Sequence, residues 1–171
     1  MRPDLGELKP GEEEIVELQL LLARRRDLVT DQTRIVTRLR EEALLSLFPA
    51  LERALDLNCK GPLTLLTHYQ TPAQLRRAGH KRVAAYLRNR GVKGSDSVAH
   101  KALSAAKAQS ITLPAQDDVA SGIVAELAGE ILALKESIQG IDEKLGQRFS
   151  VRPEARILTS LPGMGPILGA E

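Results

Sequence analysis

The sequence has 171 residues, of which 43% are hydrophobic and only 2% aromatic, and its formal net charge is +2. A single cysteine excludes an internal disulfide framework and a cysteine-based zinc cluster, and no stretch of about 18 apolar residues is present to span a membrane. We therefore expect a cytoplasmic protein without a membrane partner. We also expect an all-α fold, because Leu, Ala, Arg and Glu dominate a chain with few strand-forming aromatic residues.

The chain is expected to begin with an irregular lead-in at residues 1–11, followed by a long helix at residues 12–48 that Pro49 ends. Within this helix apolar residues recur at a spacing close to a heptad: Ile15, Leu18, Leu22, Val29, Val36, Leu39 and Leu47. A helix of this length exceeds what a compact domain of this size needs. The sequence therefore predicts that it packs against a partner helix.

The predicted partner is a second long helix at residues 113–150. Its apolar seam consists of Ile123, Leu127, Ile131, Leu134, Ile138, Ile141, Leu145 and Phe149. Spacings of three and four residues are typical of coiled-coil-like packing. The two helices can pair antiparallel within one chain or between two chains, and the sequence does not separate these options. An apolar seam of this length also predicts a homo-oligomer.

Between the long helices, residues 49–112 are expected to form a small basic subdomain of short helices. Thr71-Pro72 is typical of a helix cap followed by proline in the first turn, and Gly79, Gly91 and Gly94 are expected to end helical pieces. Cys59 is expected to be a small buried or half-buried side chain.

The charge of this subdomain is unbalanced. Between Lys60 and Gln109, ten Lys or Arg residues accompany one acid, Asp96, whereas the rest of the chain is net acidic. A surface with charge of nearly one sign predicts a polyanion partner, and the alternative is an ordinary solvated basic face. The candidate nucleic-acid-binding residues are Arg76, Arg77, His80, Lys81, Arg82, Arg88, Arg90 and Lys93.

On the helix expected from His80 to Asn89, three apolar residues (Val83, Ala84 and Leu87) can face a core while the basic residues project outward. Tyr86 can stack on a base or pack at the edge of the core, and the second role is the commoner one for a lone tyrosine. All three histidines lie in this subdomain without a carboxylate cluster beside them, so we expect no metal site. We also expect no catalytic residue in this chain.

The final stretch, residues 151–171, contains a Pro-Gly-Met-Gly-Pro turn between two apolar segments. Such a turn is typical of a helix-hairpin-helix, in which backbone N–H groups hold a DNA phosphate, here around Gly163 and Gly165. The alternative is an ordinary helix end with a Pro-Gly stop. The sequence leaves both interpretations open.

Four segments in this order resemble a known family. "LVTDQTRIVTRLREEALLSLFPALE", "LLTHYQTPAQLRRAG", the second long amphipathic helix and "RILTSLPGMGPILGAE" are similar to the middle of DEDD-type, RuvC-like bacterial insertion-sequence transposases, which are related to the Piv/MooV DNA invertases. The resemblance covers nearly the whole chain. It identifies the chain as an internal fragment with the coiled-coil linker and the truncated start of the C-terminal transposase domain.

The resemblance implies a role in DNA transposition and recombination. In that family a nuclease domain with four acidic metal ligands precedes the linker and a catalytic serine follows the Pro-Gly turn, so neither set of catalytic residues falls in this chain. The implied cofactor of the intact protein is a divalent metal such as Mg²⁺, and the implied partners are DNA and a guide-type noncoding RNA. The alternative function is a non-catalytic helical scaffold with an incidental basic face.

Overall fold

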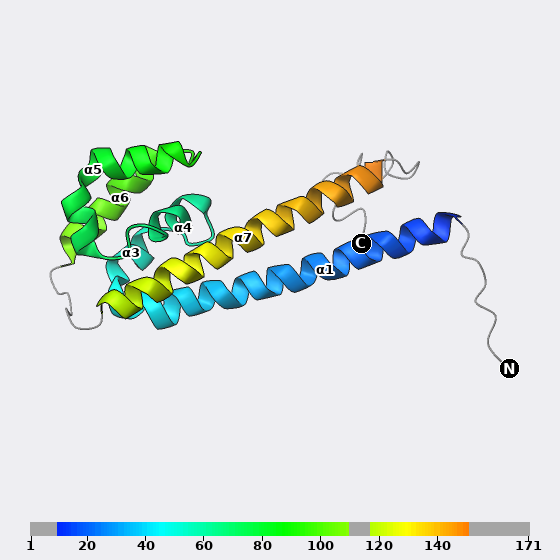
Figure 1. Cartoon of the computed structure of the whole chain (residues 1–171), viewed down its shortest axis with the longest axis horizontal. Helices are drawn as coiled ribbons and strands as arrows, with labels where there is room; N and C mark the ends of the chain where they lie inside the picture. Colours follow the sequence, from blue (N-terminus) through cyan, green and yellow to red (C-terminus); the bar gives the residue numbers. More distant parts are fainter. Residues whose placement is uncertain (1–9, 110–116, 151–171) are drawn as a thin grey trace. The chain divides into compact units, whose positions relative to one another are not determined.

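This computed structural model describes residues 10–109 and 117–150, and every regular element in these two stretches is helical (Figure 1). The predicted all-α fold class is therefore confirmed. Two long helices, α1 (Pro10–Arg38) and α7 (Asp117–Ser150), flank the shorter helices in sequence. The chain divides into two compact units: unit 1 consists of Met1–Thr30 with Glu136–Glu171, and unit 2 of Asp31–Lys135. No helix in the described ranges is long and apolar enough to cross a membrane.

In unit 1, α1 and α7 run antiparallel within one chain. Arg25 Nε lies 2.6 Å from Asp142 Oδ1, and Arg148 Nη1 lies 3.0 Å from Glu17 Oε2. The α1 partner moves toward the C-terminus as the α7 partner moves toward the N-terminus, which only antiparallel helices allow. This geometry answers the question that the sequence left open. Among the described residues of this unit, the buried apolar side chains are Leu18, Leu28, Leu145 and Phe149.

The apolar seam departs from the predicted one at three positions. Ile15, Val29 and Ile123 are exposed by 45%, 37% and 45%. Leu28 is buried in place of Val29, and Val124 is buried in place of Ile123. The seam of α1 follows a heptad that passes through a charged residue, the arginine paired with Asp142. Sequence reasoning used only apolar residues to set the register, so it shifted the seam by one residue where a polar one interrupts it.

Part of the predicted seam of α7 is covered inside the chain. Leu127, Ile131 and Leu145 are each at most 5% exposed, whereas Leu134, Ile138 and Ile141 are half-buried and Ile123 is exposed. The buried part is therefore not available for pairing between chains. Self-association of the protein through its long helices stays a prediction.

The helical run that follows α1 changes its hydrogen-bond spacing. Residues Leu39–Leu44 form a π-helical segment, η1, and α2 (Leu45–Leu47) continues from it. Leu39 and Leu44 are both fully buried, because a π-helix brings residues five apart onto one side, whereas an α-helix brings residues three or four apart together.

Pro49 separates this run from the next helix, as predicted. Phe48 has φ −146° and ψ 61°, outside the helical region, and α3 (Pro49–Ala54) begins with the proline in its first turn. A proline disfavours helical geometry in the residue before it, which explains the break at Phe48. The side chain of Phe48 is fully buried and helps to fix the start of α3 on the core of unit 2.

The remaining helices of unit 2 pack around this core. They are α4 (Lys60–Leu66), α5 (Pro72–Asn89) and α6 (Ser95–Ala108). α5 packs most extensively against α6, and α3 also packs against α6 (Figure 1). Fully buried leucines from α3, the loop after it, α4 and α5 belong to this core: Leu51, Leu57, Leu63, Leu65, Leu66, Leu75 and Leu87.

Of the three glycines predicted to end helical pieces, Gly79 and Gly91 are confirmed in that role, whereas Gly94 begins a helix. Gly79, Gly91 and Gly94 all have positive φ, at 72°, 69° and 68°. Gly91 follows the end of α5, and Gly94 is the N-terminal cap residue of α6. Gly79 interrupts α5 with ψ 167°, a region that is essentially restricted to glycine. α5 therefore consists of two helical pieces with different directions.

We expect Gly79→Ala to destabilise the fold by about 1–3 kcal/mol, the cost of forcing a residue with a Cβ into this region. The cost comes from the backbone, since a Cβ at this position would meet no atom within 4 Å. Gly129→Ala is the matched control in the interior of α7, where alanine is favoured over glycine by about 0.5–1 kcal/mol. Urea unfolding measures both variants, and an unchanged midpoint for Gly79→Ala would contradict the kink.

Cys59 is exposed, so the prediction of a buried or half-buried side chain is wrong. It is the N-terminal cap residue of α4, a position just outside the helix, and Asp56 turns the chain before it by accepting the backbone N–H of Asn58 at 2.9 Å. This bond lowers the pKa of Asp56. Local desolvation raises the pKa of Cys59, and the neighbouring Asp56 carboxylate, 3.5 Å from the sulfur, raises it further.

Asp56→Asn is therefore expected to make the Cys59 thiol more acidic. The thiolate is the reactive form, so alkylation of the native protein by iodoacetamide will reach half its maximal rate at a lower pH in the variant than in the parent. The pH profile of the alkylation rate measures the shift. Identical profiles would show that the carboxylate does not act on the thiol.

Candidate nucleic-acid interface

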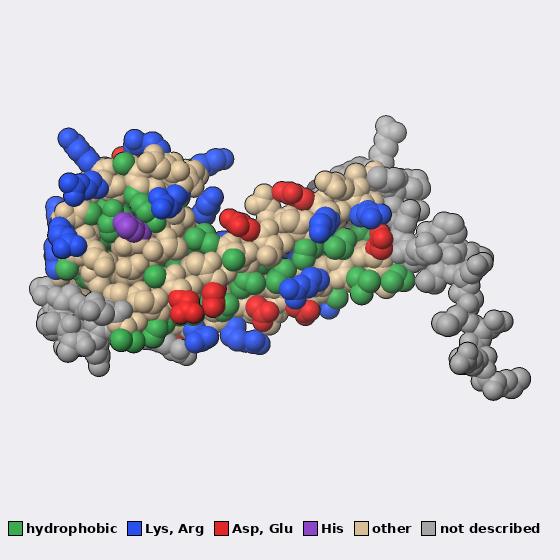
Figure 2. All heavy atoms as spheres, viewed as in Figure 1, with side chains coloured by type: hydrophobic (Ala, Val, Ile, Leu, Met, Phe, Trp, Pro, Cys, Tyr) green, Lys and Arg blue, Asp and Glu red, His purple; other side chains and the backbone are tan. Residues whose placement is uncertain are grey.

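Lys and Arg side chains gather over α5 and α6 in unit 2, where few acidic side chains are visible (Figure 2). We call this the basic surface and define it by eight residues of α5 and the turn after it: Arg76, Arg77, His80, Lys81, Arg82, Arg88, Arg90 and Lys93. All eight are exposed. These are the residues that the sequence predicted, and the structure brings them together on one compact unit.

A capping box fixes the start of α5. Thr71 Oγ1 accepts the backbone N–H of Gln74 at 3.2 Å, and Gln74 Oε1 accepts the backbone N–H groups of Thr71 and Gln70 at 3.2 and 2.8 Å. The predicted Thr71-Pro72 cap is confirmed, and the structure adds Gln74 as its second half. The first basic residues of the surface, Arg76 and Arg77, therefore follow a capped helix start.

The second half of α5 has one apolar and one basic side. Val83, Ala84 and Leu87 are buried in the core, and Lys81, Arg82, Arg88 and Arg90 are exposed. This confirms the expected division of the helix. The buried side fixes the helix against α6, so the basic side chains project from a rigid support.

Four residues of the basic surface already have partners within the chain. Arg76 Nη1 donates to the carbonyl oxygens of Ala106 and Gln109 at 2.6 and 3.1 Å, near the C-terminus of α6. Ala106 is in the last turn of α6, where carbonyl groups lack a partner within the helix. Arg88 makes an ion pair with Asp96 at 3.1 Å, and His80 Nε2 lies 3.3 Å from the backbone oxygen of Asp96. The Arg90 guanidinium makes a cation–π contact with the Tyr86 ring, 3.7 Å from its centroid.

The side chains of the other four residues have no hydrogen bond or ion pair with any residue in the described part of the chain: Arg77, Lys81, Arg82 and Lys93. Their charge is directed to solvent. Exposed cations without a carboxylate beside them are the groups that neutralise phosphates and release counterions. These four side chains are therefore the strongest candidates for contact with a nucleic acid.

Tyr86 lies at the edge of the core rather than free on the surface. His68 stacks on its ring, with centroids 4.8 Å apart and planes at 15°, and the Arg90 guanidinium lies 3.7 Å from its centroid. The hydroxyl is within 3.1 Å of Thr67 Oγ1. The core-edge interpretation of Tyr86 is therefore confirmed.

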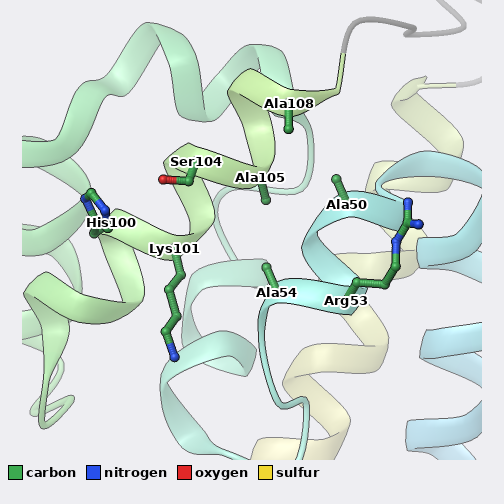
Figure 3. A pocket seen from close by; sticks show the side chains of 8 residues that line it. All are labelled: Ala50, Arg53, Ala54, His100, Lys101, Ser104, Ala105 and Ala108. Atoms are coloured by element: carbon green, nitrogen blue, oxygen red, sulfur yellow. The ribbon is translucent and has the colours of Figure 1, made fainter.

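An apolar hollow of about 460 Å³ lies between α3 and α6 (Figure 3). Alanine side chains of the two helices face each other across it, and the charged ends of Arg53 and Lys101 point apart. His100 and Ser104 complete the polar part of its lining. Its polar groups do not converge on one point, which a specific ligand site requires.

A second hollow, of about 320 Å³, adjoins the basic surface. Its lining consists of His68, Tyr69, Gln74, Arg77, Ala78 and Arg82. Sequence reasoning named the two arginines but missed the others as site residues. The available signal was an aromatic pair, His68-Tyr69, directly before the Thr71-Pro72 cap.

Within residues 10–109 and 117–150, no group of three or more His, Cys, Asp or Glu side chains is arranged to hold a metal ion. The predicted hairpin sites Gly163 and Gly165 lie outside the described residues.

Comparison with known proteins gives relatives from insertion elements. The chain is 44% identical to an uncharacterized 44.8 kDa protein of insertion element IS116 from Streptomyces clavuligerus, and 46% identical to an uncharacterized 42 kDa protein of IS900 from Mycobacterium paratuberculosis. Both matches cover the whole of this chain and 43% of the relative. An uncharacterized 43.6 kDa protein of IS110 from Streptomyces coelicolor is 29% identical over 96% of this chain.

The chain therefore spans less than half the length of the curated relatives that it matches, and its homologues are insertion-element proteins. No family model and no solved structure matches it.

Proposed function

We propose that the chain is part of an insertion-sequence transposase and that its basic surface binds DNA. The observation that carries this proposal is the group of four exposed cations without partners in the described chain: Arg77, Lys81, Arg82 and Lys93. Relatives that belong to insertion elements support it, because an element that moves in a genome needs a protein that holds its DNA.

The expected binding is electrostatic. Lys and Arg side chains on a helix contact phosphates, which position a protein on DNA without reading its sequence. No acidic side chain pairs with the four free cations in the described residues, so phosphates can take that place. The interface is therefore expected to orient DNA, and sequence selection is expected to come from another part of the system.

For the intact protein, the proposal extends to the DEDD-type, RuvC-like transposases related to the Piv/MooV invertases. Catalysis then belongs to acidic residues and a serine outside this chain, with a divalent metal ion such as Mg²⁺ held by the acids. A guide-type noncoding RNA is a further proposed partner. The similarity of the quoted sequence segments supports this part of the proposal.

Fluorescence anisotropy with a labelled duplex tests the proposal. We expect the logarithm of the association constant to fall linearly with the logarithm of the salt concentration, by about 0.9 for each phosphate contact. Absence of binding at low salt would contradict it. That result would favour the alternative function, a helical scaffold whose basic face serves only solubility.

A further inference from the structure

The smaller hollow of unit 2 lies where the turn after α4 meets the first half of α5. It combines positive charge with aromatic rings, since its lining includes Arg77, Arg82, His68 and Tyr69. Its volume of about 320 Å³ is at the lower end of the range for small-molecule sites, about 300–1,000 Å³. A space of this size suits one nucleotide unit better than a longer segment.

The two arginines come together because α5 is broken at Gly79. Residues five apart on an unbroken α-helix lie about 140° apart around its axis, so Arg77 and Arg82 would occupy different faces. The non-helical φ and ψ of Gly79 change the direction of the chain between them, and both side chains line the same hollow. Neither guanidinium has a partner among the described residues. Two such groups beside one hollow form a fork for a phosphate.

Aromatic rings form the adjoining wall. The His68 ring stacks on Tyr86 and meets the Tyr69 ring at 79°, with centroids 4.7 Å apart. The Tyr69 and Tyr86 rings are 5.4 Å apart at 76°. Tyr69 and Tyr86 pack against the hydrophobic core, so His68 is held on a fixed support although it is exposed. A fixed ring at the surface is a platform on which a base can stack.

The capping box orients one more polar group of the lining. Gln74 Oε1 accepts two backbone N–H groups, and its Nε2 amino group has no hydrogen-bond partner among the described residues. This group can donate to an acceptor on a base edge or a sugar. The His68 ring nitrogens and the Tyr69 hydroxyl likewise have no hydrogen-bond partner among the described residues.

We propose that this hollow binds one unpaired nucleotide, with its phosphate held by Arg77 and Arg82 and its base stacked on His68 beside Tyr69. The inference rests on the proposed function and adds a preference for a nucleotide outside a duplex. A base within a duplex is covered on both faces by its neighbours, so it reaches an aromatic platform only after it leaves the stack. The site therefore distinguishes a bulge, a flap or a strand end from continuous duplex.

The test compares two labelled hairpins that differ by one unpaired nucleotide in the stem, each made as DNA and as RNA. The full chain is expected to bind the bulged hairpin at least about fivefold more tightly than the paired one, the effect of stacking one base. His68→Ala and Arg82→Gln will remove this preference. His100→Ala, which removes an exposed histidine outside the hollow, will keep it. The larger preference in the DNA or the RNA pair identifies which nucleotide occupies the site.

Equal affinity of the parent for bulged and paired hairpins would overturn the inference and leave the proposed function standing, since the basic surface would still bind duplex. A bulge preference that survives in His68→Ala would also overturn it. Absence of binding to all four hairpins would overturn the proposed function, and the inference with it.

Discussion

Replacing Arg77, Lys81 and Arg82 together by Gln is expected to weaken duplex binding and flatten its salt dependence. Each lost phosphate contact lowers the slope of the log–log plot by about 0.9, so three contacts lower it by up to about 2.7. Between about 50 and 200 mM salt, the parent would then lose up to about fortyfold more affinity than the variant. Anisotropy titrations across this range measure both slopes.

The choice of these three residues follows from the structure. Arg76 is left intact because its guanidinium binds carbonyl oxygens near the end of α6, so its loss would also disturb the fold. A control variant removes the same charge from exposed residues of unit 1, Arg24, Arg26 and Lys144. It is expected to keep the parent's slope. Equal losses in the two variants would mean that net charge, rather than the basic surface, sets the affinity.

Leu44→Ala is expected to destabilise the protein by about 2–5 kcal/mol, the usual cost of removing a buried leucine side chain. The π-helical segment places Leu44 in the core, where it is fully buried together with Leu39. Without that segment the residues five apart would not share a side. Urea unfolding, with circular dichroism as the signal, measures the loss.

Leu45→Ala is the matched control, because the same residue type one position later is 51% exposed. It is expected to change the free energy of unfolding by less than about 0.5 kcal/mol. Similar costs for the two substitutions would contradict the π-helical register and indicate a helix that continues in another phase.

The features set by short-range patterns were predictable from the sequence. The apolar period of α7 and the helix-favouring composition gave the long helices and the all-α class. Thr71-Pro72 and Gly91 gave the two ends of α5, and Gly79 gave the break inside it, because each needs only a local backbone preference. The basic side of α5 followed from its helical period in the same way.

The features set by tertiary packing were not predictable. A π-helical turn has no distinct residue pattern, so Leu44 could not be assigned to the core. A seam that continues through an arginine depends on its distant partner Asp142. The hollow beside the basic surface forms only when the turn carrying His68 meets the kinked half of α5. The partners of Arg76 and Arg88 likewise come from another helix, α6. Counting charged residues in the sequence therefore gave more cations available for a ligand than the structure shows.

The most direct test of the proposed interface is a lysine footprint, in which acetic anhydride modifies the protein with and without saturating duplex DNA. Lys81 and Lys93 belong to the basic surface, and Lys144 is an exposed lysine of unit 1. Mass spectrometry is expected to show that DNA lowers acetylation of Lys81 and Lys93 and leaves Lys144 unchanged. Full acetylation of Lys81 and Lys93 in the DNA complex, or equal protection of all three lysines, would contradict binding through this surface.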